Sequence, residues 1–213
     1  MENNIRLYES QEDCCGCGTC KIVCPKHAIT MEKNAYGFLY PAIASELCIN
    51  CGICKRVCAY QQKKKNSNPR KVYAVSLKNT EILRQSASGG VFSGIAERWI
   101  DEDGVVFGAA LISEHGKLAV KHCSAMTKEE LKRLFGSKYV QSDLEDTFVD
   151  AKDYLEKGKK VLYSGTPCQI AGLKAYLGTD YENLFTIDLV CHGVPGNRMF
   201  QEYLRSEETR RGA

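Results

Sequence analysis

The sequence of 213 residues predicts two consecutive parts of different fold class, a short α+β part and then a longer α/β part. The first prediction rests on nine of the twelve cysteines, which lie between residues 14 and 58 with two short strand-like stretches among them. The second rests on the residues after position 72, where strand-like and helix-like stretches alternate. With 44% hydrophobic and 26% charged residues, the composition is that of a globular protein.

The sequence gives no indication of export or of a membrane span. Its apolar runs are far shorter than the roughly 20 residues that a transmembrane helix needs. The first residues lack the basic and then apolar pattern of a signal peptide. We therefore expect a cytoplasmic protein, in which disulfides are rare. Twelve cysteines in such a compartment favour metal binding or redox chemistry.

Eight of the cysteines form two copies of the spacing C-x2-C-x2-C-x3-C, in which matching cysteines are 34 residues apart. This spacing is typical of two four-iron clusters, each held by three cysteines of one copy and the fourth cysteine of the other. We expect the fourth cysteine of each copy to open a short helix. The predicted ligand sets are Cys14, Cys17, Cys20 and Cys58 for one cluster, and Cys48, Cys51, Cys54 and Cys24 for the other.

Two tetrahedral zinc sites are the alternative use of eight cysteines. Structural zinc usually takes C-x2-C pairs separated by a longer loop, which this spacing does not provide. Ala59 stands where the first copy has Pro25, and this difference removes no ligand. Cys15 has no counterpart in the second copy, and we interpret it as a small residue beside the cluster.

Residues 10–62 resemble a bacterial-type ferredoxin with two [4Fe–4S] clusters. Short strands are predicted at residues 28–31 and 37–40, with a turn between them. A domain of this size buries little apolar surface, so we expect the clusters to hold it together. We assign the ferredoxin-like domain to residues 1–62.

The formal net charge of +3 does not indicate nucleic-acid binding, because it is concentrated in one segment. Residues 61–71 carry five basic and no acidic side chains, whereas residues 1–60 are balanced and the remainder is slightly acidic. We interpret this polar stretch as a solvated linker rather than a phosphate-binding site. The linker is assigned to residues 63–71 and the second domain to residues 72–213.

The second domain is predicted to alternate strands and helices. Thr127 and Asp143 are the expected N-caps of two of its helices. Residues 91–100 have the apolar spacing of a helix. The predicted strands cover residues 72–77, 104–112, 118–123, 160–164 and 185–190.

Three loops of this domain carry residues suited to chemistry. Residues 86–90 place two glycines ahead of a helix, where they either expose N–H groups to a phosphate or flavin or form an ordinary turn. Cys168 opens a helix directly after a strand, so it is either a dipole-stabilised thiolate or a half-buried thiol. Cys191 and His192 end a strand, where α/β sheets bind ligands, although such pairs are more often structural. Cys123 is expected to be a core thiol.

Together with residues 136–142, these loops closely resemble the coenzyme F-420 hydrogenase/dehydrogenase beta-subunit family, in which a ferredoxin-like part precedes an α/β flavin-family domain. The resemblance implies FAD near the loops, which exchanges electrons with the clusters and hydride with a deazaflavin or another two-electron substrate. The implied catalytic residues are Lys138, Cys168 and His192, with Lys138 either a cation near the flavin or a surface lysine. The implied cofactor-binding residues are Ser88, Gly89, Gly90, Lys138, Tyr139, Thr166, Pro167, Cys168, Gln169 and Cys191.

Members of this family are usually longer, so we expect the flavin-family domain to be incomplete. We interpret the chain either as a truncated or split gene product or as one whose remaining lobe comes from another chain. The main hypothesis is an iron–sulfur flavoprotein oxidoreductase that acts with a redox partner protein or partner subunit and with a small-molecule acceptor or donor. The alternative is a non-catalytic electron carrier with a docking or vestigial second domain. The identity of the acceptor stays open.

Overall fold

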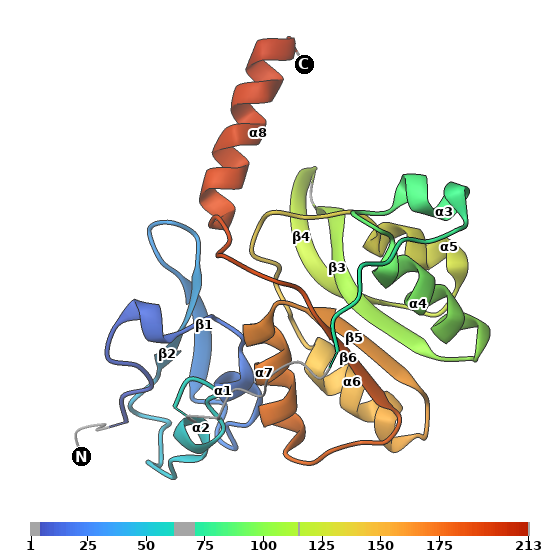
Figure 1. Ribbon diagram of the computed structural model, residues 1–213. Helices are drawn as coiled ribbons and strands as arrows, with labels where there is room; N and C mark the ends of the chain where they lie inside the picture. Colours follow the sequence, from blue (N-terminus) through green and yellow to red (C-terminus); the bar gives the residue numbers. More distant parts are fainter. Residues whose placement is uncertain (1–4, 62–70, 115, 213) are drawn as a thin grey trace.

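The computed structural model describes residues 5–61, 71–114 and 116–212 (Figure 1). A small cysteine-rich part lies beside helix α7 of a layered α/β part, and the C-terminal helix projects away from both. Most of the expected linker, residues 63–70, lies outside the described residues. In the part of the chain that the structure describes, no helix is long and apolar enough to cross a membrane.

The small part contains a two-stranded antiparallel sheet and two matching helical turns. Strand β1 (Ile29–Lys33) pairs with β2 (Leu39–Ile43). Helices α1 (Thr19–Ile22) and α2 (Ile53–Arg56) each follow a glycine in the left-handed conformation, Gly18 and Gly52, with φ of 75° and 71°. Because side chains other than glycine strain this conformation, the repeated glycine fixes the same helix start in both copies.

The predicted position of these helices relative to the cysteines is wrong. The third cysteine of each copy lies within the helix, as Cys20 does in α1, and the fourth, Cys24, follows its end. The helix begins early because the left-handed glycine turns the chain before the third cysteine. The fourth cysteine therefore lies beyond the helix, away from the other three cysteines of its copy.

Few side chains form the core of the small part. The buried residues of this core are Leu7, Ile29 and Cys54. The rings of Tyr8 and Tyr40 contact each other at a centroid distance of 5.8 Å. So small a core supplies little stability on its own, as expected for a domain that depends on bound metal.

The α/β part is built on a four-stranded sheet of order β4-β3-β5-β6. Strands β3 (Val105–Glu114) and β4 (Lys117–Ala125) form an antiparallel hairpin. Strands β5 (Val161–Gly165) and β6 (Leu184–Asp188) run parallel to β3. The carboxyl ends of β3, β5 and β6 therefore share one edge of the sheet, where α/β proteins bind ligands.

Helices cover both faces of this sheet (Figure 1). Successive residues of β3 point to opposite faces, so Phe107 packs with α6 and α7 whereas Val106 packs with α4 and α5. The helix N-terminus of α4 lies toward the carboxyl end of β3, because Phe92 approaches Gly108 while Trp99 approaches Gly104. The helices are α4 (Val91–Asp101), α5 (Lys128–Leu131), η2 (Lys132–Leu134), α6 (Thr147–Glu156) and α7 (Pro167–Leu177).

Two of the predicted elements differ in the structure. Residues 72–77 form no strand: Val72 is 85% exposed, and no described strand lies alongside to pair with this segment. Asp143 does not cap a helix, since its backbone bridges to Lys121 beside β4 and α6 begins only at Thr147. The predicted cap at Thr127 is confirmed, because its hydroxyl accepts the N–H of Glu130 at the start of α5.

Three elements lie outside the sheet and its covering helices. The short helices η1 (Gln11–Asp13) and α3 (Thr80–Gln85) precede the cysteine loop and α4. Helix α8 (Asn197–Arg211) contains no buried residue and extends away from the body (Figure 1). Its first turn contacts the small part, where the Arg198 guanidinium donates to the carbonyl of Ala35 over 3.0 Å.

Candidate metal centres

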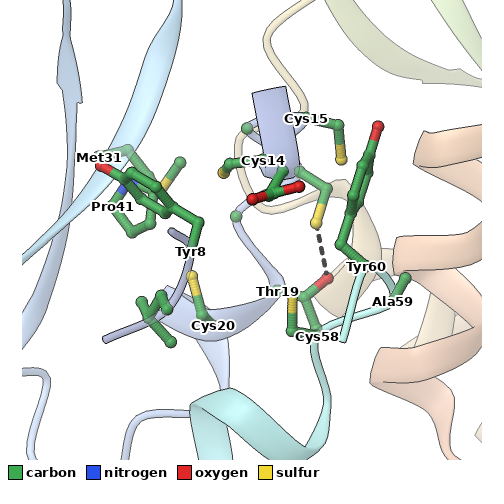
Figure 2. Close-up of a pocket in the computed structure, with 15 residues that line it drawn as sticks. Tyr8, Cys14, Cys15, Thr19, Cys20, Met31, Pro41, Cys58, Ala59 and Tyr60 are labelled. Carbon is green, nitrogen blue, oxygen red and sulfur yellow. Dashed lines mark hydrogen bonds between the residues drawn. The ribbon is translucent and has the colours of Figure 1, made fainter. Parts of the chain in front are cut away.

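Four cysteines from both copies of the repeat line one pocket in the small part (Figure 2). Apolar side chains such as Met31 and Pro41 close one side of it, and Tyr60 stands on the other. We call this pocket the proximal pocket, because it faces the α/β part. Its four repeat cysteines are Cys14, Cys17, Cys20 and Cys58.

The other four repeat cysteines line a second pocket, which we call the distal pocket. One of them, Cys51, is exposed, as is the neighbouring Ile49. The four are Cys24, Cys48, Cys51 and Cys54. The structure thus brings together the members of each predicted ligand set, with the fourth cysteine of each copy in the pocket of the other.

The thiols of the proximal pocket are crowded in apolar surroundings. Burial, together with the neighbouring Cys17 and Cys14, raises the pKa of Cys20 to about 12. Bound iron would remove this penalty, because the positive charge of a metal stabilises a thiolate. Within the described residues, no three His, Cys, Asp or Glu side chains could hold a single metal ion. In a four-iron cluster each thiolate binds a different iron, so four separate thiols that line one pocket suit such a cluster.

The proximal pocket packs directly against α7. The Thr19 hydroxyl donates to the carbonyl of Gly172 over 3.1 Å and lies 3.3 Å from the Cys17 sulfur. A Cβ on Gly172 would lie 3.0 Å from the Cys17 Cβ, so only glycine lets the cysteine loop approach this closely. The Gln141 amide also donates to the carbonyl of Cys15 over 3.1 Å. These contacts fix the proximal pocket to the α/β part.

Cys168 joins two thiols of the small part at this contact. Its sulfur lies 3.1 Å from the Thr166 hydroxyl at the start of α7. Cys15, Cys17 and Cys168 influence one another's ionisation. Hydrogen bonding by the Cys15 thiol lowers the pKa of Cys168 and of Cys17, while the same contacts raise the pKa of Cys15. Cys15 lines the proximal pocket beside its four repeat cysteines.

A buried polar network, which the sequence did not indicate, supports the loop that holds Cys168. The His122 ring donates from Nε2 to the carbonyl of Ser164 over 3.0 Å, so Nδ1 accepts from the Ser142 hydroxyl over 2.8 Å. Ser142 in turn accepts from the Gln169 amide, whose carbonyl oxygen accepts the Thr166 N–H. The network joins β4, β5, α7 and residue 142, and it holds the first turn of α7 in place.

Because His122 is buried and neutral, we expect the protein to lose stability as the pH falls from about 6.5 toward 4. Burial lowers the pKa of His122 to about 4 from 6.5. The unfolded chain therefore binds the proton first, and this one group costs about 2 kcal/mol of unfolding free energy between pH 7.5 and pH 5. Urea unfolding followed by Trp99 fluorescence measures the loss. The His122→Phe variant is the control: it should be less stable at pH 7.5 but lack this part of the pH dependence, and an unchanged dependence would contradict the assignment.

The predicted anion loop ahead of α4 is packed against its own chain. A Cβ on Gly89 would lie 2.2 Å from the Val75 carbonyl oxygen, and one on Gly90 would lie 2.9 Å from Leu77. Ser88 has a positive φ of 51°. The close packing explains both glycines without a ligand, although the loop lies at the carboxyl edge of the sheet.

Four further residues of the predicted flavin site make no described contact with Cys168. They are Lys138, Tyr139, Cys191 and His192. The Lys138 ammonium donates to the carbonyls of Phe135 and Arg133 at the end of η2, and burial lowers its pKa to about 8. Tyr139 is 80% exposed. Cys191 and His192 are exposed after β6. Among the described contacts, none joins Lys138 to Cys168 or His192.

Comparison with known proteins identifies two segments of the chain. Residues 13–62 match the family of 4Fe–4S dicluster domains. Residues 158–212 match the family described as the C terminus of the coenzyme F420 hydrogenase/dehydrogenase beta subunit. The chain is therefore a mixed α/β protein with a 4Fe–4S dicluster domain. Its C-terminal segment is related to the coenzyme F420 hydrogenase/dehydrogenase beta subunits, which confirms the predicted resemblance for these residues.

Part of the chain is similar to a solved structure. It is described as "Xenon derivatization of the F420-reducing [NiFe] hydrogenase complex from Methanosarcina barkeri", and the similarity has 21% identity and a TM-score of 0.49. The match covers 63% of this chain and 48% of the other, so the chain spans about half the length of that relative. No curated protein matches the sequence.

Proposed function

We propose that this protein is an iron–sulfur electron-transfer protein that carries a [4Fe–4S] cluster in each of its two cysteine pockets. The observation that carries the proposal is the crossed composition of the pockets, in which three cysteines of one copy are joined by the fourth of the other. The match of residues 13–62 to dicluster domains supports it. The spacing and the crossed sets favour clusters over zinc.

The surroundings of the pockets suggest an order of electron transfer. The distal pocket includes the exposed Cys51 and the exposed Lys26, so it is accessible to a redox partner, either a separate protein or another subunit. Lys55 and Arg56, at the end of α2, make this side basic and suited to an acidic partner. The proximal pocket contacts α7 instead. Electrons would pass between the partner and the α/β part through the distal and then the proximal cluster.

The finer proposal is that the proximal cluster exchanges electrons with an FAD-linked two-electron acceptor or donor, such as a deazaflavin. FAD would supply the conversion between single electrons and hydride. The loops after β5 and β6 and ahead of α4 share one edge of the sheet, which supports this proposal. Gly89 and Gly90 are packed against their own chain, and the Thr166 N–H is bonded to Gln169, whereas Cys191 and His192 are exposed. The FAD proposal therefore requires contacts beyond those that these loops supply.

The second candidate is an electron carrier without catalysis, whose α/β part serves for docking. The contacts of Lys138 with two carbonyls and of Gly89 with Val75 favour it, because they give these residues a structural role. The two candidates share the clusters and differ only in the flavin. A flavin absorbance band that bleaches on reduction would distinguish them.

Anaerobic purification followed by iron, sulfide and flavin analysis tests the proposal. We expect about eight irons and eight sulfides per chain, as two [4Fe–4S] clusters require. The double variant Cys123→Ser with Cys191→Ser is the matched control, since neither cysteine lines a pocket, and its iron content should equal that of the wild type. Zinc in place of iron would overturn the proposal. Absence of flavin from the complete assembly would leave only the second candidate, the electron carrier without catalysis.

A further inference from the structure

The buried hydroxyl of Thr19 has two acceptors within reach, one in each part of the chain. Its oxygen lies 3.1 Å from the carbonyl oxygen of Gly172 in α7 and 3.3 Å from the sulfur of Cys17, the contact drawn as a dashed line in Figure 2. Thr19 is only 1% exposed, so water does not compete for either contact. The residue is the first of α1 and lines the proximal pocket beside the predicted ligand Cys17.

The two acceptors compete once iron is bound. A threonine hydroxyl carries one proton, so it donates fully to only one acceptor at a time. As a thiol, Cys17 can donate to the Thr19 oxygen while Thr19 donates to the Gly172 carbonyl, and both contacts are satisfied. A sulfur bound to iron is a thiolate, which has no proton and only accepts. The sulfur and the carbonyl then need the same proton.

The charge on the sulfur decides which acceptor receives the proton. Gly172 lies inside α7, so its carbonyl also accepts the N–H four residues further on and stays paired when the hydroxyl turns away. Hydrogen bonds to ionised acceptors are stronger than those to neutral ones. More negative charge on the Cys17 sulfur therefore draws the hydroxyl from α7 toward the proximal pocket.

We propose that the Thr19 hydroxyl is a redox-responsive hydrogen-bond donor, which donates to the Cys17 sulfur when the proximal cluster is reduced and to the Gly172 carbonyl when it is oxidised. The inference rests on the proposed function, since it requires that cluster. One electron from the redox partner adds negative charge to the thiolates, while Thr19 keeps its proton, so no covalent bond of the protein changes. The hydrogen bond raises the reduction potential of the cluster, and reduction loosens the contact with α7.

The second copy of the repeat lacks this donor at the matching position. Ile53 stands 34 residues after Thr19, begins α2 and lines the distal pocket. Its side chain has no hydrogen-bonding group. The proposed effect is therefore confined to the proximal cluster, and the repeat supplies its own control.

The first experiment measures the reduction potentials of both clusters by anaerobic titration of the full chain, followed by electron paramagnetic resonance. Thr19→Val keeps the shape of the side chain but removes the hydroxyl. We expect it to lower one of the two potentials by about 59 mV, a tenfold change in the ratio of reduced to oxidised cluster, and to leave the other unchanged. Thr19→Ser retains a hydroxyl and should restore the potential. Ile53→Val places the same side chain in the second copy without removing a hydroxyl, so it should change neither potential.

The second experiment measures the contact with α7 in each redox state. Amide hydrogen exchange of peptides from α1 and α7 is followed by mass spectrometry in the oxidised and the reduced wild type. Reduction should speed this exchange about threefold, as the loss of one hydrogen bond implies. Thr19→Val lacks the bond in both states, so its exchange should be fast and independent of reduction.

Unchanged potentials in Thr19→Val with full iron would overturn the inference and leave the proposed function standing. Equal exchange in both redox states of the wild type would overturn it as well. Thr19→Ala, which removes the same hydroxyl, is measured alongside, so the comparison does not depend on one variant assembling its clusters. A wild type without iron would instead overturn the proposed function.

Discussion

Replacing Cys14 and Cys58 together by serine is expected to leave one cluster per chain, whereas replacing Cys14 and Cys24 together is expected to leave none. Cys14 and Cys58 line the same pocket, so both substitutions damage the same cluster. Cys24 lines the other pocket, although it belongs to the same sequence copy as Cys14. Iron and sulfide analysis should give about four of each in the first variant and none in the second.

The comparison is internally controlled, because each variant loses two thiols from the same small domain. If each sequence copy held its own cluster, the two results would be exchanged, and that outcome would contradict the crossed arrangement. The double variant Cys24→Ser with Cys48→Ser extends the test. Both residues line the distal pocket, so it should also keep about four irons.

Gly172→Leu is expected to disrupt the contact between the two parts of the chain. The new Cβ alone would meet the Cys17 Cβ at 3.0 Å and its sulfur at 3.1 Å, so the cysteine loop must move. Overpacking of this kind costs about 2 kcal/mol of unfolding free energy, even though leucine favours a helix by almost 1 kcal/mol over glycine. Urea unfolding measures the loss, and iron release to a chelator should be faster.

Lys174→Leu is the control for this substitution, since it introduces the same side chain at an exposed position of the same helix. It should change the unfolding free energy by less than about 0.5 kcal/mol and leave iron release unchanged. Equal effects of the two substitutions would show that the Gly172 contact with the cysteine loop contributes nothing specific.

The order of strands and helices between residues 104 and 188 could be predicted, because apolar runs, turn residues and cap residues mark the elements locally. The segment at residues 72–77 is equally rich in β-forming residues but has no described neighbour to pair with, so its β propensity is not realised. Propensity describes only the conformation that a segment favours, whereas a strand also needs a neighbouring strand with which to form hydrogen bonds. The predicted N-cap at Asp143 is wrong for a similar reason, because the backbone of Asp143 forms a bridge to Lys121 instead.

The cysteine sets could be predicted because their spacing is local and repeated. The surroundings of Cys168 could not, because they depend on contacts between distant residues: Cys15 comes from the first domain, and the His122 network joins residues 20 to 42 positions apart. Lys138 shows the opposite case, in which a family loop suggested a flavin contact. The described contacts of its ammonium are with backbone carbonyls three and five residues away, and its predicted flavin contact stays a prediction.

The contact between α1 and α7 also affects the order in which the chain acquires its structure. The Thr19 hydroxyl and the Gly172 carbonyl are 153 residues apart, and Arg198 reaches back 163 residues to Ala35. During synthesis the cysteine loops leave the ribosome long before α7 and α8 exist. Closing loops of this length is entropically unfavourable and slow. The small domain is therefore made before α7 can pack against it, and early loading with metal would protect its thiols in that interval.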